Sequence, residues 1–112
     1  MPLLGLPPLN APIKSLERLW LDTVCIYDQF NDNVMADTDW DAMAKALNER
    51  KAEWSPYFKH ALGADKWEAW DVGTTGAGVD WTQGIPLLVY NWIKALDGDY
   101  QTLHTRHQSL YL

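Results

Sequence analysis

The sequence contains one cysteine, Cys25, and three histidines among its 112 residues. A single thiol excludes an intramolecular disulfide framework and any zinc site built from several cysteines. No run of about 18 apolar residues occurs, so we expect no membrane-spanning segment and no membrane partner. Basic residues are also scarce, because nine Lys and Arg stand against fifteen Asp and Glu and leave a net charge of −6. An acidic domain repels the negatively charged phosphates of a nucleic-acid backbone, so we expect no direct nucleic-acid binding.

Tryptophan, in contrast, is abundant, with seven residues in a chain of one-domain length. The composition is 47% hydrophobic and 21% charged, which is typical of a globular domain rather than of a disordered segment. Each indole can bury roughly 150–250 Å². We therefore expect most tryptophans to form the core, and some to lie at an edge or an interface.

Residues 1–11 combine four leucines with three prolines and one glycine. Proline fixes φ and removes a hydrogen-bond donor, so this pattern predicts an extended arm rather than a helix. Exposed leucines on such an arm are an aggregation liability unless they pack on their own domain or dock on a neighbour. Because the arm contributes to no predicted helix, we expect the rest of the chain to fold without it. The candidate protein-binding residues here are Leu3, Leu4, Leu6 and Leu9.

Residues 12–112 show helical periodicity and no alternating strand pattern. The sequence predicts an all-α fold, with a single small domain of four to five helices following the extended Pro/Leu-rich arm. The first helix spans residues 12–30 and buries a stripe that includes Trp20, Val24 and Tyr27. A second, from an N-cap at Thr38 with Asp41 in capping-box spacing, runs to Trp54. Further helical segments are expected at residues 55–62, at 64–71, from a start between 81 and 86 to 96, and from 99 onward. The segment that ends at 96 is apolar on nearly all faces, so we expect it to lie at the centre of the fold.

Candidate catalytic and metal-binding patterns all have simpler explanations. The glycine-rich segment 73–78 lacks the Gly-Lys-Ser/Thr ending of a phosphate-binding loop. His104 and His107 share a helical face, but a closed zinc site needs four nitrogen or sulfur ligands. Cys25 lies between Val24 and Ile26 and is typical of a small buried hydrophobe. We therefore expect no enzymatic activity, no cofactor and no metal.

The segment from Trp70 to Trp81, WDVGTTGAGVDW, followed by Ile85-Pro86, resembles a segment of small tailed-phage proteins that assist tail assembly. The resemblance covers residues 54–96. It implies a role in phage morphogenesis and a location in the host cytoplasm or the virion, and it supplies no catalytic residues. The single cysteine agrees with that location, and so does the N-terminal segment, which we expect not to be a secretory signal peptide because it is interrupted by prolines and has no Lys or Arg before Lys14.

Three functional hypotheses remain open. The first is an assembly protein that docks on larger subunits, or on copies of itself, through the arm and through a second surface at Trp70, Trp81 and the loop between them. The second is an acidic inhibitor that imitates nucleic acid, of the anti-restriction or anti-CRISPR class. The third is a binder of sugars or small molecules that uses the tryptophans. The first is favoured, because residues 38–62 carry four positive and four negative charges, whereas a mimic needs a dense surface of one sign.

Overall fold

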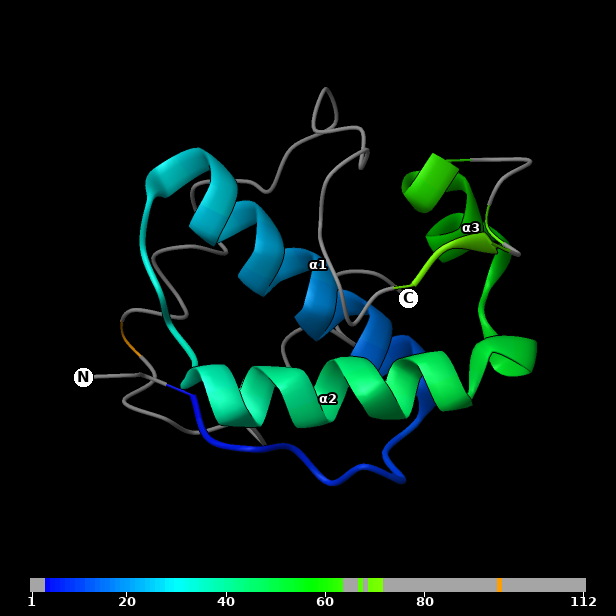
Figure 1. Cartoon of the computed structure of the whole chain (residues 1–112), viewed down its shortest axis with the longest axis horizontal. Coiled ribbons are helices and arrows are strands. Elements are labelled where there is room, and N and C mark those ends of the chain that lie inside the picture. The colour runs from blue at the N-terminus through cyan, green and yellow to red at the C-terminus, as the bar shows by residue number, and fades with distance from the viewer. Residues whose placement is uncertain (1–3, 64–66, 68, 72–94, 96–112) are drawn as a thin grey trace.

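The computed structural model describes residues 4–63, 67, 69–71 and 95. Three α-helices follow the arm: α1 (Ile13–Phe30), α2 (Asp37–Glu49) and α3 (Pro56–Gly63), with a short 3₁₀ helix, η1 (Lys51–Glu53), between the last two. The chain reverses after α1, so that α2 runs back across its first half, and α3 stands beside the same end of α1 (Figure 1). The described part is helical and contains no strand, in agreement with the all-α prediction. Of the helix expected to run to residue 96, only Ala95 is described, and it is helical. The helix expected from residue 99 onward lies outside the described residues.

The ends of α1 follow the predicted signals. Pro12 precedes the first helical residue, and its carbonyl accepts the N–H of Ser15 at 2.9 Å. At the other end Asn31 adopts a left-handed conformation with φ 52° and donates to the Tyr27 carbonyl at 3.1 Å. Asparagine tolerates this conformation better than most residues, so it closes the helix and turns the chain toward α2.

The predicted boundaries of α2 are wrong at both ends. The helix begins after Ala36, and no side chain caps it, so Thr38 lies within the first turn instead of capping it. Asp37 and Asp39 also lie in that turn, where the positive end of the helix dipole favours them. The helix ends at Glu49 rather than continuing to Trp54, because the chain tightens into η1 after Arg50. The Trp54 indole donates to the Leu47 carbonyl at 2.9 Å and satisfies one of the terminal carbonyls of α2.

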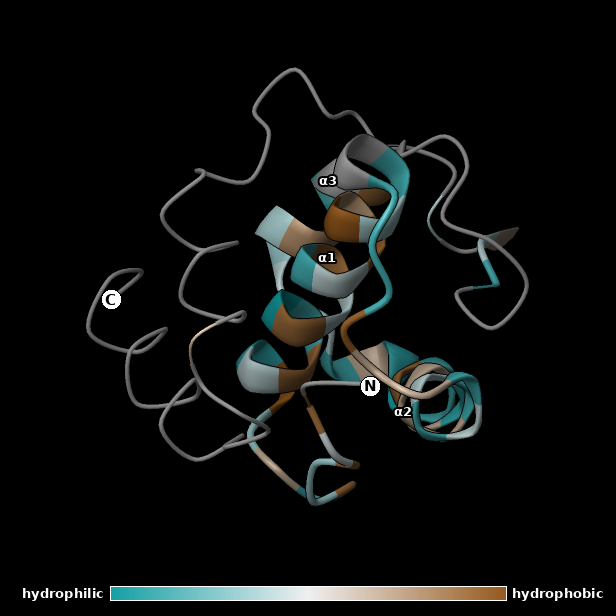
Figure 2. Cartoon of the chain, turned by 90° about the vertical axis from the view of Figure 1, so that its left-hand side faces the viewer, coloured by the Kyte–Doolittle hydropathy of each residue, from teal (hydrophilic) through white to brown (hydrophobic). Residues whose placement is uncertain are grey.

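Helix α1 lies at the centre of the described fold. From Ser15 to Ile26 every residue is buried except the half-buried Arg18, and four of these buried residues are polar. The expectation that Tyr27 belongs to the buried stripe is wrong, because its side chain is 65% exposed. Helix α2, seen nearly end-on in Figure 2, shows mainly hydrophilic residues on its outer turns. It contributes only Met43, Ala44, Ala46 and Leu47 to the buried set.

All five described tryptophans lie in the core or pack against it. Trp20 is fully buried, with its ring 6.2 Å from that of Trp40 and 5.7 Å, edge-on, from that of Phe58. Phe58 in turn meets Trp54 edge-on at 4.9 Å. Such edge-to-face contacts add about 0.5–1.5 kcal/mol to the burial itself. Trp20 and Trp54 are buried and confirm the expected tryptophan-rich core, whereas Trp40, Trp67 and Trp70 are partly buried and pack against it.

A buried carboxylate joins α1 to the start of α3. Glu17 is 3% exposed, and its Oε2 accepts the backbone N–H of Ser55 at 2.7 Å. Ser55 caps α3 in the predicted manner, since its Oγ accepts the N–H of Phe58 at 3.2 Å. Burial raises the pKa of Glu17 above its ordinary value. This rise is only partly offset by hydrogen bonds from the backbone and the side chain of Ser55 and by the positive charges of Lys14 and Arg18.

The raised pKa of Glu17 predicts a specific dependence of stability on pH. The folded chain holds this proton more tightly than the unfolded chain, so the free energy of unfolding should fall as the pH rises from the ordinary glutamate range through the folded pKa. Glu17→Gln keeps an acceptor for Ser55 and removes the titration. Denaturant titrations at a series of pH values should show this decline in the wild type and in the exposed control Glu49→Gln, and not in Glu17→Gln. A decline of equal size in all three proteins would contradict the assignment.

Candidate functional site: the anchored arm

The arm is fastened to the domain at Leu4. The Leu4 side chain is 2% exposed and belongs to the hydrophobic core. Its N–H donates to the Val34 carbonyl at 2.7 Å, and it pairs with Met35 in a single parallel β-bridge. The segment between α1 and α2 therefore supplies both an apolar slot and a backbone acceptor for the arm.

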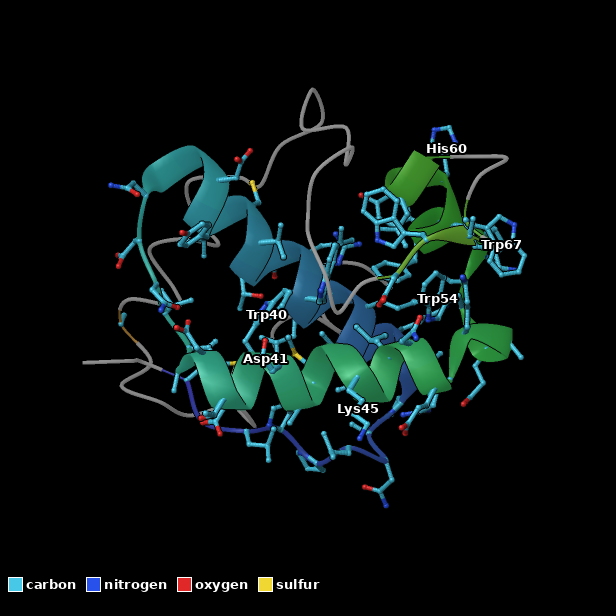
Figure 3. All side chains as sticks on the ribbon, viewed as in Figure 1. Trp40, Asp41, Lys45, Trp54, His60 and Trp67 are labelled. Carbon is cyan, nitrogen blue, oxygen red and sulfur yellow. The ribbon has the colours of Figure 1, made fainter. Side chains whose placement is uncertain are left out.

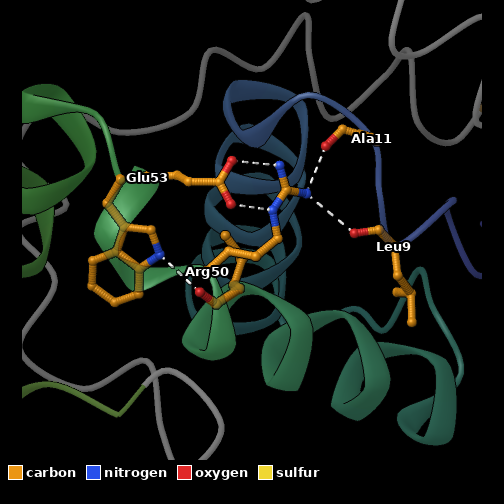
Figure 4. A network of polar contacts seen from close by, with 6 residues as sticks. Leu9, Ala11, Arg50 and Glu53 are labelled. Carbon is orange, nitrogen blue, oxygen red and sulfur yellow. Dashed lines mark hydrogen bonds and ion pairs between the residues drawn. The ribbon is translucent and has the colours of Figure 1, made fainter.

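Arg50, at the end of α2, fastens the arm a second time. Its Nη1 donates to the carbonyl of Leu9 at 3.1 Å and to that of Ala11 at 2.7 Å (Figure 4). The guanidinium is held in place by Glu53 through two hydrogen bonds, Nε to Oε2 at 2.8 Å and Nη2 to Oε1 at 3.0 Å. Such two-bond pairs fix the plane of the guanidinium as well as its position. The hydrogen bond from Arg50 also lowers the pKa of the Glu53 carboxyl, which favours the charged form that the pair requires.

The two attachments match the length of α2. Met35 lies just before the first residue of the helix and Arg50 directly after the last. Thirteen helical residues at 1.5 Å each extend about 20 Å, and the seven steps from Leu4 to Ala11 span at most roughly 25 Å when extended. The arm therefore runs along α2 from one end to the other (Figure 1).

Between the attachments the arm presents two leucines to solvent. Leu6 is 47% exposed and Leu9 is 41% exposed, whereas Pro7 between them is buried. Leu9 lies in a turn closed by the Ala11 N–H and the Pro8 carbonyl at 3.0 Å, and Arg50 holds two carbonyls of that turn. The prolines and the hydrogen bonds from Arg50 restrict the conformation of the arm. Binding through such a restricted segment would cost less conformational entropy than binding through a flexible peptide.

The structure separates the predicted binding residues into different groups. The docking role expected for Leu4 is corrected, because its side chain is buried in the chain's own core and is shielded from an outside partner. Leu6 and Leu9 remain exposed. Trp70 is half-buried against the core, and its carbonyl accepts Lys51 Nζ at 2.8 Å. Leu3 and Trp81, with most of the loop between Trp70 and Trp81, lie outside the described residues.

Arg50 and Glu53 are functional residues that the sequence analysis did not single out. Arg50 is half-buried and contacts a segment about 40 residues away in the chain, at separations of 41 and 39 residues. The available signal was the opposite-charge spacing of three residues, which marks a helical surface pair. Nothing in that spacing identifies the distant carbonyls that the pair serves.

The described residues offer little for catalysis or metal binding. Over residues 4–63 and the few described beyond them, no group of three His, Cys, Asp or Glu side chains could hold a metal ion. Cys25 is buried within α1. In the same part of the chain, every helix is too short or too polar to cross a membrane.

Comparison of the chain with protein-family models, with curated protein sequences and with solved structures finds no match in any of the three. The functional argument therefore depends on the geometry of the arm and on the charges and rings around it.

The anchoring of Leu4 changes what the arm is expected to contribute to stability. Leu4→Ala should lower the free energy of unfolding by about 2 kcal/mol, at the low end of the range for a buried leucine, because a chain end can relax into the space. Leu6→Ala, on the same arm but exposed, should change it by less than about 0.5 kcal/mol. Denaturant titration of both variants tests this expectation. It replaces the earlier expectation that the rest of the chain folds equally well without the arm. Equal stability of the Leu4→Ala variant and the wild type would show that the arm is not part of the core.

Proposed function

We propose that this chain is a non-enzymatic assembly protein that docks on a larger protein subunit through the anchored arm. The observation that carries the proposal is the pair of exposed leucines, Leu6 and Leu9, held outward by attachments on either side. A domain that only needed to fold would gain from covering these side chains. A restrained apolar arm is instead suited to a complementary groove on another protein.

The setting we propose is phage morphogenesis, with the chain acting in the host cytoplasm or as an accessory subunit of the virion. The support is the resemblance of residues 54–96 to small tail-assembly proteins. Of its motif from Trp70 to Trp81, only Trp70 and Asp71 lie in the described part of the chain. In this proposal the loop after Trp70 supplies a second contact with the partner, and neither contact involves nucleic acid, a membrane or a cofactor.

A second candidate function rests on the distribution of acidic charge. Residues 27–44 contain five aspartates and no lysine or arginine. They cover the end of α1 and the start of α2, whereas the second half of α2 carries one charge of each sign, Lys45 and Glu49. An inhibitor that imitates nucleic acid would place this surface in a basic groove.

The dependence of binding on salt distinguishes the two functions. A photo-crosslinking amino acid at position 6 or 9 would capture the arm's partner covalently, and one at the exposed Lys45 serves as the control. The affinity of the identified partner is then measured between about 0.1 M and 1 M salt, over which the Debye length shrinks from about 10 Å to about 3 Å. Apolar docking by the arm predicts little change. A fall of about a hundredfold, with competition by duplex DNA, would reject the assembly function in favour of the inhibitor.

A further inference from the structure

The arm lies in a site on the domain that has the features of a peptide-binding groove. At one end the Leu4 side chain is buried in the core, and its backbone N–H donates to the Val34 carbonyl at 2.7 Å. At the other end Arg50 donates to two carbonyls of the arm at 3.1 and 2.7 Å. Grooves that bind extended peptides use the same combination of backbone hydrogen bonds and pockets for single side chains. The arm is therefore attached to the domain in the way that a separate peptide would be.

Both ends of this groove belong to the helical domain. The slot for Leu4 lies at the segment between α1 and α2, where Val34 and Met35 are part of the hydrophobic core. Arg50 directly follows α2, and Glu53 orients its guanidinium through two hydrogen bonds that involve no residue of the arm. A guanidinium held in this way is preorganised for the carbonyls that it binds. Neither end of the groove is therefore built from the arm.

The arm itself is held by few contacts. Three of the residues 4–11 are buried, namely Leu4, Pro7 and Ala11. Helix α1 begins without help from the arm, because the Ser15 N–H donates to the carbonyl of Pro12, which is extended with φ −51° and ψ 137°. A segment with few buried contacts opens at a much lower free energy than the whole fold. The arm can therefore leave the groove while α1 stays intact.

We propose that the groove binds the arm of a second copy of the chain, so that copies exchange arms where they are held close together. The structure identifies the occupant, because the arm is the segment that the groove holds and every copy carries one. An exchanged arm makes the same contacts as an arm in its own groove, so exchange of such an element is a low-cost route to association. This inference goes beyond the docking of Leu6 and Leu9, because it uses the buried attachments of the arm.

The local concentration of copies decides between the closed and the exchanged form. The covalent connection gives each copy's own arm an effective concentration in the millimolar range. Copies in dilute solution therefore stay closed, and exchange becomes favourable where an assembly packs them at a comparable concentration.

Binding of a free arm peptide to the full chain tests the groove. Leu4→Asp replaces the buried side chain with a carboxylate, so it should release the chain's own arm and leave the groove open. A fluorescent, acetylated peptide of residues 4–12 should bind this variant with a dissociation constant below about 1 mM. The wild type should bind the peptide at least about tenfold more weakly, because its own arm competes. The same peptide carrying Leu4→Asp should not bind.

Two charge reversals on the domain serve as a matched pair. Arg50→Glu, added to the Leu4→Asp chain, removes the donor for two arm carbonyls and should weaken peptide binding about tenfold or more. Lys45→Glu reverses the charge of an exposed residue near the middle of α2 (Figure 3), and it should leave the affinity unchanged. Circular dichroism verifies that every variant is folded.

A mixture of two variants tests exchange between copies. The Leu4→Asp chain has an open groove, and the Arg50→Glu chain has an intact arm and a damaged groove. In sedimentation equilibrium at about 0.5 mM each should be monomeric alone, and the mixture should contain a 1:1 heterodimer. A mixture that stays monomeric would overturn the proposal, as would an absence of peptide binding to Leu4→Asp at about 1 mM. Either result leaves the docking of Leu6 and Leu9 standing, because the photo-crosslinking experiment does not involve the groove.

Discussion

Trp20→Ala should lower the free energy of unfolding by about 3–5 kcal/mol, the range for truncation of a fully buried aromatic side chain. Trp20 is 0% exposed and contacts rings from both α2 and α3, so the cavity would open where the three helices meet. Its indole Nε1 is buried and has no acceptor among the described residues, so within this part of the chain the side chain contributes through packing and not through a hydrogen bond. Against a total stability of about 5–15 kcal/mol, the loss is large enough to unfold much of the protein at 37 °C.

Tyr27→Ala provides the matched control for this prediction. It truncates another aromatic residue of α1, but one that is 65% exposed, and it should cost less than about 0.5 kcal/mol. Urea titration followed by far-UV circular dichroism measures both changes. A cost under about 1 kcal/mol for Trp20→Ala would show that α1 is not the centre of the core.

The sequence alone predicted much of the helical framework. Periodicity located α1 within a residue of its start, and Ser55-Pro56 marked the start of α3 correctly. These signals succeed because they are local: an N-cap side chain and the fixed φ of proline act within one turn. The start of α2 was predicted too late because no side chain caps the helix, so the capping-box spacing of Thr38 and Asp41 is not used. Its end was also predicted too late, because the chain continues as the 3₁₀ helix η1 and periodicity does not separate the two kinds of helix.

The arm shows what local patterns cannot predict. Proline and leucine spacing identified an extended segment, but the same pattern fits a free docking arm and one that is tied down. The difference comes from long-range contacts: Leu4 with Val34 and Met35, and Arg50 with the carbonyls of Leu9 and Ala11. Backbone acceptors carry no side-chain signature, so no pattern in the sequence marks where Arg50 will bind. Of the four leucines proposed for docking, Leu6 and Leu9 are exposed, Leu4 is buried, and Leu3 lies outside the described residues.

Replacing both exposed leucines should abolish most of the affinity for the arm's partner. Full burial of a leucine contributes roughly 1.5–3 kcal/mol, and somewhat less than half of each side chain is left to be covered, since Leu6 is 47% and Leu9 41% exposed. The double variant Leu6→Ser/Leu9→Ser should therefore lose about 1.3–2.6 kcal/mol of binding free energy, which is about a 10- to 80-fold loss of affinity. Its stability should stay within about 0.5 kcal/mol of the wild type, because neither side chain belongs to the core.

The affinity of this double variant for the partner captured at positions 6 and 9, measured by isothermal titration calorimetry beside the wild type, tests the central claim most directly. We expect a loss of about tenfold or more with an unchanged melting temperature, and full affinity in the control Lys45→Ser. An affinity equal to that of the wild type would contradict the account, because it would show that the exposed leucines of the anchored arm do not dock on the partner.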